Sequence, residues 1–294
     1  MSKKMLFIIN PRAGKTKSPA PLLEAAAHFG NNGWLLKVCL TEERGHAARL
    51  AAQYGADFDA VVCAGGDGTL NETISGLMTL PQRPPIGYIP YGSTNDFAAS
   101  LHLPANPLEA AKLIAAGTPK PLDIGLRNDR HFAYVASFGA FTRSSYSAPQ
   151  SAKNLLGHFA YILEGVKDLD SLRPYRCTVE TDTELFSGEF IFGGVCNSTS
   201  LAGLVKLDPA RVKMDDGKLE LLLLRMPKTP ADLQNLILAL TKMQYDIPGV
   251  IFRHVEQLRL TTNDNIPWSL DGEYAPSQRV VEIRSLPHAI ELLT

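Results

Sequence analysis

The sequence has few cysteines and no long hydrophobic run. Its 294 residues include four cysteines, none in a C-x-x-C pair, which argues against a disulfide scaffold and is typical of reduced thiols. Aliphatic runs such as Leu221–Leu224 are far shorter than the ~18 apolar residues that span a membrane. Only five apolar residues precede Asn10, too few for a signal-peptide core. We therefore expect a cytoplasmic chain, and any membrane contact to be peripheral.

The sequence also lacks an excess of either charge and the motifs of common hydrolases. Lys and Arg total 29 against 30 Asp and Glu, so no overall field favours nucleic acid, and an acidic ligand has to be bound locally. The seven histidines form no H-E-x-x-H motif, and no G-x-S-x-G motif occurs. Metallohydrolase and serine-hydrolase functions are therefore unsupported.

The first third of the chain alternates short apolar runs with helical stretches. This βαβ alternation predicts an α/β domain with a mostly parallel sheet. Ligands of such sheets bind at the carboxyl ends of the strands, so the loops after those ends are the first candidates for a site. The expected strands are 5–9, 34–40, 60–64 and 86–89, and the expected helices 20–29, 45–54, 69–77, 94–101 and 107–116.

Beyond about residue 122 the pattern changes to alternating, β-branched and aromatic segments. This pattern predicts a mainly antiparallel β-sandwich or open barrel. Two apolar stripes at helical spacing, Leu155–Leu169 and Leu233–Met243, interrupt it, and such stripes usually face a core. The expected strands are 122–126, 131–138, 176–181, 186–196, 218–225, 255–261 and 279–283.

The most informative motif is the glycine-rich stretch Gly65–Thr69. It follows an expected strand and precedes an expected helix, so its glycines can turn sharply and direct main-chain N–H groups at a phosphate. Asp67 would repel a phosphate, which implies a bridging Mg²⁺ or a role in proton transfer. The plainer alternative is a strand–turn–helix connection in which Asp67 caps the helix.

Two further polar loops follow other expected strands of the same sheet. One is Asn10–Lys15, where an amide, Gly14 and basic side chains suit a phosphate, although such a stretch is also ordinary turn chemistry. The other is Pro90–Phe97, which could simply start a helix capped by Ser93 or Thr94. Because all three loops lie at the carboxyl ends of strands in one sheet, we expect them to form a single site.

Together, Asn10–Gly14, Gly65–Thr69 and Gly92–Phe97 resemble the diacylglycerol kinase catalytic-domain family, which includes bacterial lipid kinases and the sphingosine and ceramide kinases. The resemblance extends along nearly the whole chain. It implies an NAD kinase/diacylglycerol kinase-like α/β domain over residues 1–122, a β-rich lipid-substrate domain over 123–284, and a nucleotide site in the cleft between them. It also implies that the last strand, near 285–294, returns to the first domain.

The resemblance assigns roles to individual residues. Asp67 and Asp96 would share a catalytic Mg²⁺. Ser93 stands where the family usually has Thr, which keeps a hydroxyl. The implied nucleotide-binding residues are Asn10, Pro11, Arg12, Ala13, Gly14, Lys15, Thr41, Gly65, Gly66, Asp67, Gly68, Thr69, Leu70, Asn71, Glu72, Ser93, Thr94 and Asn95.

Two motifs of the second half also match the family. In the stretch 213–219, the resemblance implies a structural Mg²⁺ on the Asp216 carboxylate and the carbonyls of Lys213 and Lys218, whereas the residues alone equally suit a hairpin turn. In the stretch 268–273, it implies the base that takes the proton from a lipid hydroxyl. That base is Asp271 or Glu273, and the sequence does not decide between them.

The predicted function is an ATP-dependent, Mg²⁺-requiring lipid kinase that transfers the γ-phosphate to a hydroxyl of a lipid such as diacylglycerol. The alternatives are an NAD kinase-like enzyme with a soluble substrate, since such kinases share the G-G-D-G-T loop, and a non-catalytic nucleotide-binding regulator. The expected partners are a lipid at a membrane surface and a second copy of the chain in a homodimer, but no nucleic acid. The stretch Leu155–Leu169 and loops such as Phe138–Tyr146 are predicted to face the lipid.

Overall fold

The fold is that of a computed structural model, which describes residues 2–14, 19–93, 95–139, 172–201 and 205–294. Contacts within the chain divide it into two compact units. The first unit consists of Met1–Leu122 and His288–Thr294, and the second of Asp123–Pro287. In the described residues, no helix is both long enough and apolar enough to cross a membrane.

The first unit is built on a parallel sheet, as predicted. Its strands are β1 (Lys3–Ile9), β2 (Trp34–Leu40), β3 (Ala60–Gly65) and β4 (Ile86–Pro90), in the order β4-β3-β1-β2. The long strand β17 (Val280–Leu293) ends beside β4, where Leu292 pairs with Ile86 in parallel. The carboxyl ends of β1, β3 and β4 therefore lie along one edge, which brings the loops that follow them together.

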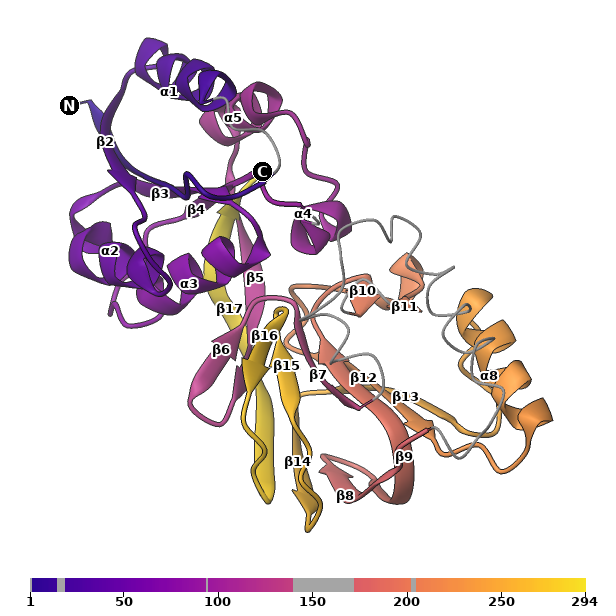
Figure 1. Ribbon diagram of the computed structural model, residues 1–294. Coiled ribbons are helices and arrows are strands. Elements are labelled where there is room, and N and C mark those ends of the chain that lie inside the picture. The colour runs from indigo at the N-terminus through magenta and orange to yellow at the C-terminus, as the bar shows by residue number, and fades with distance from the viewer. Residues whose placement is uncertain (1, 15–18, 94, 140–171, 202–204) are drawn as a thin grey trace. The chain divides into compact units, whose positions relative to one another are not determined.

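Helices cover both faces of this sheet (Figure 1). Helices α1 (Ala20–Asn31) and α5 (Pro107–Ala116) pack on one face, and α2 (His46–Tyr54), followed by the short 3₁₀ helix η1 (Gly55–Asp57), and α3 (Asp67–Leu77) on the other. The short helix α4 (Asp96–Ser100) follows β4. A parallel sheet covered on both sides has apolar strands, and every residue of β3 and β4 is buried. The core on the α1 and α5 face includes Met5, Phe7, Leu22, Phe29, Val62, Ile89 and Ile114.

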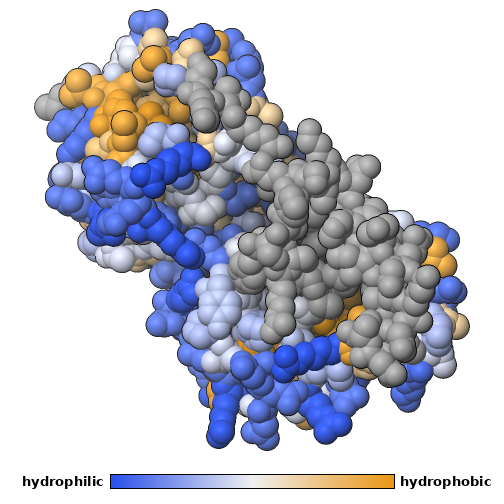
Figure 2. Space-filling view, in the orientation of Figure 1, coloured by the Kyte–Doolittle hydropathy of each residue, from blue (hydrophilic) through white to orange (hydrophobic). Residues whose placement is uncertain are grey.

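Strand β2 forms an apolar edge of the first unit. It is the last strand in the order of this sheet, and Leu35, Val38 and Leu40 on it are about half exposed. Figure 2 shows apolar surface over this part of the unit. The other strands of the sheet bury their apolar side chains, so the edge differs from the rest of the unit.

The second unit is mainly antiparallel, also as predicted. Its described strands run in the order β16-β15-β7-β9-β8-β14-β17, and β12 pairs with both β9 and β13. The helix α8 (Pro230–Thr241) begins with a capping box formed by Thr229 and Asp232. The strands and the short 3₁₀ helix of the unit are β5 (Pro119–Arg127), β6 (Arg130–Phe132), β7 (Val135–Gly139), β8 (Tyr175–Thr181), β9 (Leu185–Cys196), β10 (Ser200–Leu201), β11 (Val205–Lys206), η3 (Pro209–Arg211), β12 (Leu219–Arg225), β13 (Val250–Val255), β14 (Gln257–Thr262), β15 (Trp268–Leu270) and β16 (Glu273–Ala275).

Alternating burial along β14 shows how the second unit forms its core. Leu258 and Leu260 face inward, whereas Gln257, Arg259 and Thr261, which alternate with them, are exposed. The inward residues join an aromatic and aliphatic cluster that includes Phe138, Phe190, Trp268 and Ile283. Since Phe138 is 1% exposed within this cluster, its expected contact with lipid is wrong. Residues 140–146 and 155–169 of the predicted lipid-facing segments lie outside the described residues.

The structure differs from the predicted strands of the second unit in several places. The expected strand 131–138 is split into β6 and β7, because Ala133 and Tyr134 donate their N–H groups to Asp271 instead of to a neighbouring strand. The sequence analysis missed β13, which precedes the expected strand 255–261. The segments expected near 279–283 and 285–294 form one continuous strand, β17. A long strand can pair with different neighbours along its length. The local hydrophobic pattern of the sequence then does not show that the strand is continuous.

Candidate functional site

The glycine-rich turn after β3 leads directly into α3. Gly66 precedes the helix in an extended conformation and has no side chain that could cap the first turn. A Cβ on Gly65 would lie 2.6 Å from Thr69 Cβ, and one on Gly92 would lie 2.4 Å from Gly66 Cα. The glycines therefore allow this loop to touch the loop after β4. The start of α3 presents main-chain N–H groups at this point, the arrangement that binds phosphates.

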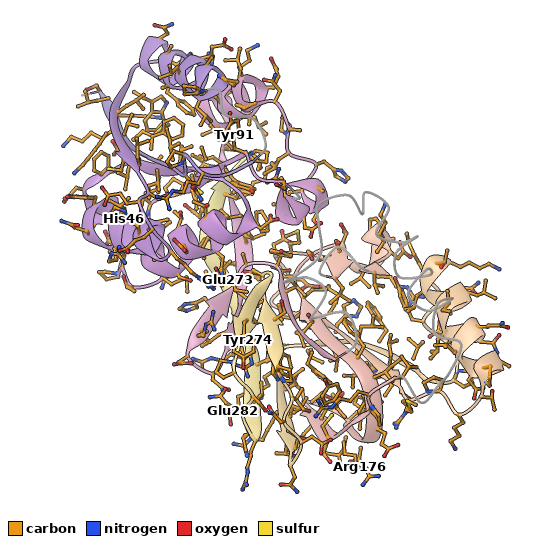
Figure 3. The ribbon with its side chains drawn as sticks, in the orientation of Figure 1. His46, Tyr91, Arg176, Glu273, Tyr274 and Glu282 are labelled. Carbon is orange, nitrogen blue, oxygen red and sulfur yellow. The ribbon has the colours of Figure 1, made fainter. Side chains whose placement is uncertain are left out.

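The loop after β1 is joined to the same place. The Asn10 main-chain N–H donates to the Ala64 carbonyl at 2.9 Å, and its side-chain Nδ2 donates to Thr69 Oγ1, also at 2.9 Å. Gly14 has φ +76°, and a Cβ there would lie 2.5 Å from the carbonyl oxygen of Tyr91, which Figure 3 labels. The three glycine-containing loops singled out in the sequence thus come together at one edge of the sheet.

Asp67 links two of these loops through its carboxylate. It accepts hydrogen bonds from the main-chain N–H groups of Asp96 at 3.0 Å and Phe97 at 3.2 Å. The alternative that Asp67 caps a helix is therefore correct in part, but the capped helix is α4 and not α3, which Asp67 itself begins. The carboxylate fixes the start of α4 against the start of α3.

The Asp67 and Asp96 carboxylates form a pair that disfavours two negative charges. Burial raises the pKa of Asp67, and burial together with the charge of Asp67 raises the pKa of Asp96 to about 7. Among the described residues, neither carboxylate makes an ion pair with a basic side chain. A divalent cation with oxygen ligands would relieve this repulsion, so the pair fits Mg²⁺.

The other predicted nucleotide-binding residues have mixed environments. Thr41 is buried, and its main-chain N–H donates to the Ile9 carbonyl at 2.8 Å. Pro11, Arg12 and Ser93 are exposed, whereas Leu70 is fully buried in the core. The Leu70 side chain is therefore unable to contact a ligand. Lys15 and Thr94 lie outside the described residues.

Two polar side chains of α3 differ in what they bind. Glu72 accepts hydrogen bonds from the main-chain N–H groups of Gly45 at 2.7 Å and Ala47 at 3.3 Å, so it caps α2. Its carboxylate holds the fold together, and a nucleotide contact through this side chain is not supported. Asn71 is 6% exposed, and its Oδ1 has no hydrogen-bond partner in the described structure. An orphaned oxygen beside a glycine-rich turn suits a bound ligand.

Sequence analysis missed a tyrosine that lies behind these loops. Tyr88 of β4 is buried, and its Oη lies 3.2 Å from the Gly65 carbonyl oxygen and 3.3 Å from Asn95 Oδ1. Asn95 Oδ1 in turn accepts the N–H of Gly92 at 2.9 Å. A hydroxyl in an otherwise aliphatic buried strand was the signal that could have identified Tyr88, because buried hydroxyl groups need partners.

In the second unit, the predicted base lies on a tight hairpin between β15 and β16. Asp271 has φ +48° and Gly272 φ +83°, the two positive values of a type I′ turn, for which Asp-Gly is a preferred sequence. Asp271 is 4% exposed, and its carboxylate accepts three main-chain N–H groups. The donors are Ala133 at 2.6 Å, Tyr134 at 3.1 Å and Val135 at 2.8 Å.

Glu273 follows this turn and remains accessible. Its side chain is 24% exposed and lies 3.7 Å from the Arg130 guanidinium (Figure 3). Of the two candidates for the base, Asp271 therefore holds the hairpin in place, whereas Glu273 has a carboxylate that a substrate can approach. The sequence could not decide this, because the donors to Asp271 lie more than 130 residues away in the chain.

The turn 213–218 has its own group of oxygen atoms. Asp216 Oδ1 accepts the N–H of Lys218 at 3.0 Å, and Asp123 Oδ2 accepts the N–H of Gly217 at 2.6 Å. Glu220, two residues after the turn, is fully buried, and burial raises its pKa to about 9. Within the described residues, no three His, Cys, Asp or Glu side chains are placed to hold a metal ion. A cation here would depend on one carboxylate with carbonyls and water, which suits Mg²⁺.

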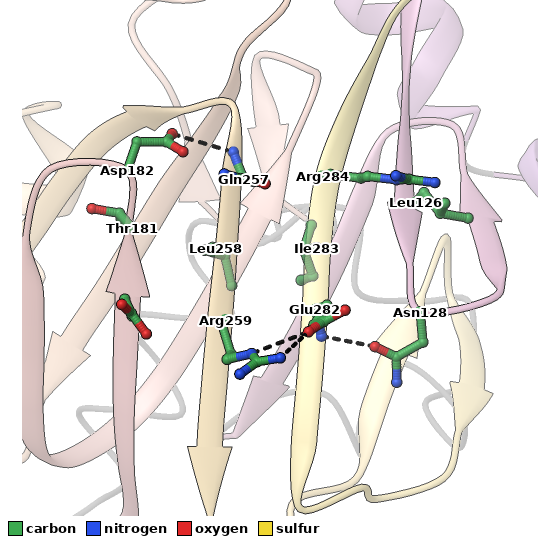
Figure 4. Close-up of a pocket in the computed structure, with 11 residues that line it drawn as sticks. Leu126, Asn128, Thr181, Asp182, Gln257, Leu258, Arg259, Glu282, Ile283 and Arg284 are labelled. Atoms are coloured by element: carbon green, nitrogen blue, oxygen red, sulfur yellow. Dashed lines mark hydrogen bonds and ion pairs between the residues drawn. The ribbon is translucent and has the colours of Figure 1, made fainter.

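A separate groove of about 540 Å³ lies on the second unit and is lined by residues of β14 and β17, among others (Figure 4). Several of its charged side chains already have partners. Arg259 bonds Glu282 at 2.5 Å, and the main-chain N–H of Gln257 donates to Asp182. None of the predicted site residues lines this groove. We therefore assign no ligand to it.

The chain is similar to known proteins along its whole length. Residues 4–126 match the diacylglycerol kinase catalytic domain, and residues 135–294 match the YegS C-terminal NAD kinase beta sandwich-like domain. A diacylglycerol kinase of Bacillus subtilis is 33% identical over 92% of this chain and 90% of its own length. One of Staphylococcus epidermidis is 31% identical over 100% of this chain and 93% of its own length.

Solved structures share the fold. The crystal structure of a diacylglycerol kinase from Bacillus anthracis matches with a TM-score of 0.81 and 24% identity, over 99% of this chain and 96% of that one. The α/β first unit and the β-sandwich second unit predicted from the sequence are thereby confirmed. With glycine loops and paired carboxylates at the sheet edge, and with full-length relatives at this level of identity, the chain belongs to the diacylglycerol kinase family of kinases.

Proposed function

We propose that this protein is a lipid kinase that transfers the γ-phosphate of ATP to a hydroxyl of diacylglycerol or a similar lipid at a membrane surface. One observation carries the proposal. The Asp67 carboxylate binds the main-chain N–H of Asp96 and its charge acts on the Asp96 carboxylate, at the start of α3, where the Gly66 and Gly92 backbones lie close together. Phosphoryl transfer needs groups that bind the phosphates and a cation that neutralises their charge. A helix N-terminus can bind phosphates, and the two carboxylates beside it are suited to Mg²⁺.

The first unit would bind the nucleotide. Main-chain N–H groups at the start of α3 and the loop after β1 would hold the phosphates, and Asp67 and Asp96 would hold the cation. Bound Mg²⁺ would neutralise the charge that develops on the phosphate oxygens. Through its hydrogen bonds to α4, Asp67 would also hold the loop after β3 against the loop after β4. The phosphate-binding groups would then be in position before the nucleotide binds.

The second unit would supply the base. Glu273 would accept the proton of the acceptor hydroxyl, and the nearby Arg130 would orient its carboxylate. Asp271 would act through structure, since its three hydrogen bonds fix the hairpin that carries Glu273. Transfer then balances simply. The hydroxyl oxygen bonds to the γ-phosphorus, the bond to ADP breaks, and the proton leaves on the Glu273 carboxylate.

The test is transfer of labelled phosphate from MgATP by the purified chain, with diacylglycerol, monoacylglycerol and phosphatidylglycerol in mixed micelles and NAD as a soluble acceptor. We expect a labelled lipid and a loss of about 10²–10⁴-fold in Glu273→Gln, the usual contribution of a general base. Glu282→Gln is the matched control, because Glu282 is also a surface carboxylate of the second unit paired with an arginine. Label in NAD alone would replace the proposal with a soluble-substrate kinase, and ATP binding without any labelled acceptor would indicate a regulator.

A further inference from the structure

Tyr88 places a hydroxyl group in the buried strand β4, whose other residues are isoleucine, glycine and proline. Its side chain is 2% exposed, and its ring packs edge-on against that of Phe97 in α4, with ring centroids 6.1 Å apart. A phenylalanine would fill nearly the same space in this core and would need no hydrogen-bond partner. The hydroxyl group therefore calls for a reason other than packing.

The Tyr88 hydroxyl group has two acceptors at the edge of the sheet. It donates to the Gly65 carbonyl oxygen at 3.2 Å and to Asn95 Oδ1 at 3.3 Å. Both distances are longer than the ~2.7–2.8 Å typical of an O–H···O bond, as expected when two acceptors share one proton. Gly65 ends β3, and Asn95 directly precedes α4. The hydroxyl group therefore connects the loop after β3 with the loop after β4.

Asn95 in turn holds the main chain of Gly92. Its Oδ1 accepts the Gly92 N–H at 2.9 Å, and its Nδ2 donates to the Gly92 carbonyl at 3.1 Å. Asn95 has φ +55°, in the left-handed region that non-glycine residues rarely adopt, so these bonds help to keep it there. A Cβ on Gly92 would lie 2.4 Å from Gly66 Cα. The close approach of Gly92 to the glycine-rich turn therefore depends on an asparagine side chain that is bonded to Tyr88.

The Tyr88 hydroxyl group remains protonated, so it is a lasting donor. Burial raises the pKa of Tyr88 well above its ordinary value, and nearby negative charges, that of Asp67 first, raise it further. Asp67 binds the first main-chain N–H groups of α4, whereas Tyr88 binds the residue that precedes this helix. Two side chains thus fix the end of the loop after β4, and only Asp67 is suited to bind a cation as well.

We propose that Tyr88 is a positioning residue of the nucleotide site. Through Asn95, its hydroxyl group holds the loop after β4 against the glycine-rich turn, so that MgATP meets a loop that is already ordered. A loop that is ordered before binding loses less conformational freedom on binding, which increases affinity. This inference rests on the proposed function, because it takes these loops to bind MgATP, and it adds a residue that does not touch the ligand.

The test compares Tyr88→Phe, which keeps the ring and removes the hydroxyl group, with the unsubstituted chain. Hydrogen exchange of main-chain N–H groups is measured without nucleotide, and MgATP binding is measured by calorimetric titration. In Tyr88→Phe we expect faster exchange at Gly92, Asp96 and Phe97, and a dissociation constant for MgATP about 3–10-fold higher, the equivalent of one hydrogen bond. Saturating MgATP should slow this exchange in both chains. In the kinase assay, the KM for ATP should rise by the same factor while kcat stays nearly unchanged.

Tyr245→Phe is the matched control. Tyr245 is also buried, and its hydroxyl group accepts the main-chain N–H of Asp208 in the second unit. This variant should lose about as much stability as Tyr88→Phe, but it should leave MgATP binding and exchange in the loop after β4 unchanged. Asn95→Ala should speed the exchange, and combining it with Tyr88→Phe should add little, because the two side chains act as one unit.

Two results would overturn the role of Tyr88 and leave the proposed function standing. One is equal exchange in Tyr88→Phe and the unsubstituted chain. The other is faster exchange in Tyr88→Phe with unchanged affinity for MgATP. If the unsubstituted chain itself binds no MgATP, the proposed function fails, and the role of Tyr88 in nucleotide binding fails with it.

Discussion

Each unit of the molecule contains an aspartate that accepts main-chain N–H groups, and the two aspartates differ in what else they can do. Asp67 in the first unit accepts two N–H groups of α4 and remains beside a second carboxylate, Asp96. Asp271 in the second unit accepts three and is 4% exposed. Asp67 can therefore join in binding a cation, whereas Asp271 is committed to the fold and leaves the chemistry to Glu273.

The difference arises from the two kinds of sheet. In the parallel sheet of the first unit, all strands point the same way, and the polar loops gather at their carboxyl ends, where helix starts also lie. In the antiparallel sheet of the second unit, strands are joined by tight turns, and hydrogen bonds to the sheet hold such a turn in position. Asp271 makes these hydrogen bonds, and the Glu273 side chain, two residues later, remains partly exposed.

The largest effect on stability should come from breaking the hydrogen bonds of Asp271 to the main chain. In Asp271→Asn, the side-chain amide keeps one oxygen, which can still accept the N–H groups of Tyr134 and Val135, but its NH₂ group faces the N–H of Ala133, so at least one of the three hydrogen bonds is lost. A buried donor left without a partner costs about 1–3 kcal/mol, so we expect the free energy of unfolding to fall by at least that amount in urea titrations. Asp129→Asn, at an exposed aspartate of the same unit, should change it by less than about 0.5 kcal/mol. Equal stability of both variants would disprove the structural role of Asp271.

The same replacement at Asp67 should affect binding more than stability. The amide oxygen of an Asn can accept only one of the two N–H groups of α4 that Asp67 holds, which lowers stability. Burial raises the pKa of Asp67, so its charged form is less favourable in the folded than in the unfolded chain, and a neutral side chain removes that cost. Because these two effects oppose each other, we expect a change of less than about 1 kcal/mol in unfolding, but a loss of about 10²-fold in MgATP affinity through loss of a cation ligand. Glu72→Gln is the control, because Glu72 caps α2. It should lower stability and leave MgATP affinity unchanged, and the reverse pattern would contradict these assignments.

Replacing Gly92 by alanine should separate the touching loops of the first unit. The new Cβ would lie 2.4 Å from Gly66 Cα, so the backbone must shift, at a cost of about 1–3 kcal/mol. We expect weaker nucleotide binding along with lower stability. Gly30→Ala in α1 is the matched control, since no atom lies within 4 Å of its Cβ, and it should be neutral or stabilising by up to about 1 kcal/mol. Nucleotide binding as tight in Gly92→Ala as in Gly30→Ala would show that contact between the loops is not needed.

The smallest effect compares the thiols of the two units. Burial raises the pKa of Cys63 and of Cys177 to about 12, and that of Cys196 well above its ordinary value. Since only the thiolate reacts, these three thiols should stay unreactive toward a disulfide reagent at pH 8. We expect one of the four cysteines, the partly exposed Cys39, to react in the native chain and all four in denaturant. Rapid reaction of a second thiol in the native chain would show that one unit opens locally.

Much of the first unit was predictable from the sequence, because its signals are local. The strands β1, β2 and β3 and the helix α5 follow from apolar periodicity to within a few residues, and glycines mark the loops that need close backbone contact. The second unit was predicted less well. The continuity of β17 and the break at Ala133 depend on partners far away in the chain, which local patterns do not record.

The sequence by itself determined that three polar, glycine-containing loops follow the strands of one sheet and that carboxylates accompany them. The tertiary structure alone decided what each carboxylate does. It showed that Asp67 caps α4, that Glu72 caps α2, that Asp271 holds a hairpin in place while Glu273 stays accessible, and that Glu220 is buried. The physical reason is that a carboxylate's role depends on which N–H groups, charges and water molecules surround it, and folding brings these from distant parts of the chain.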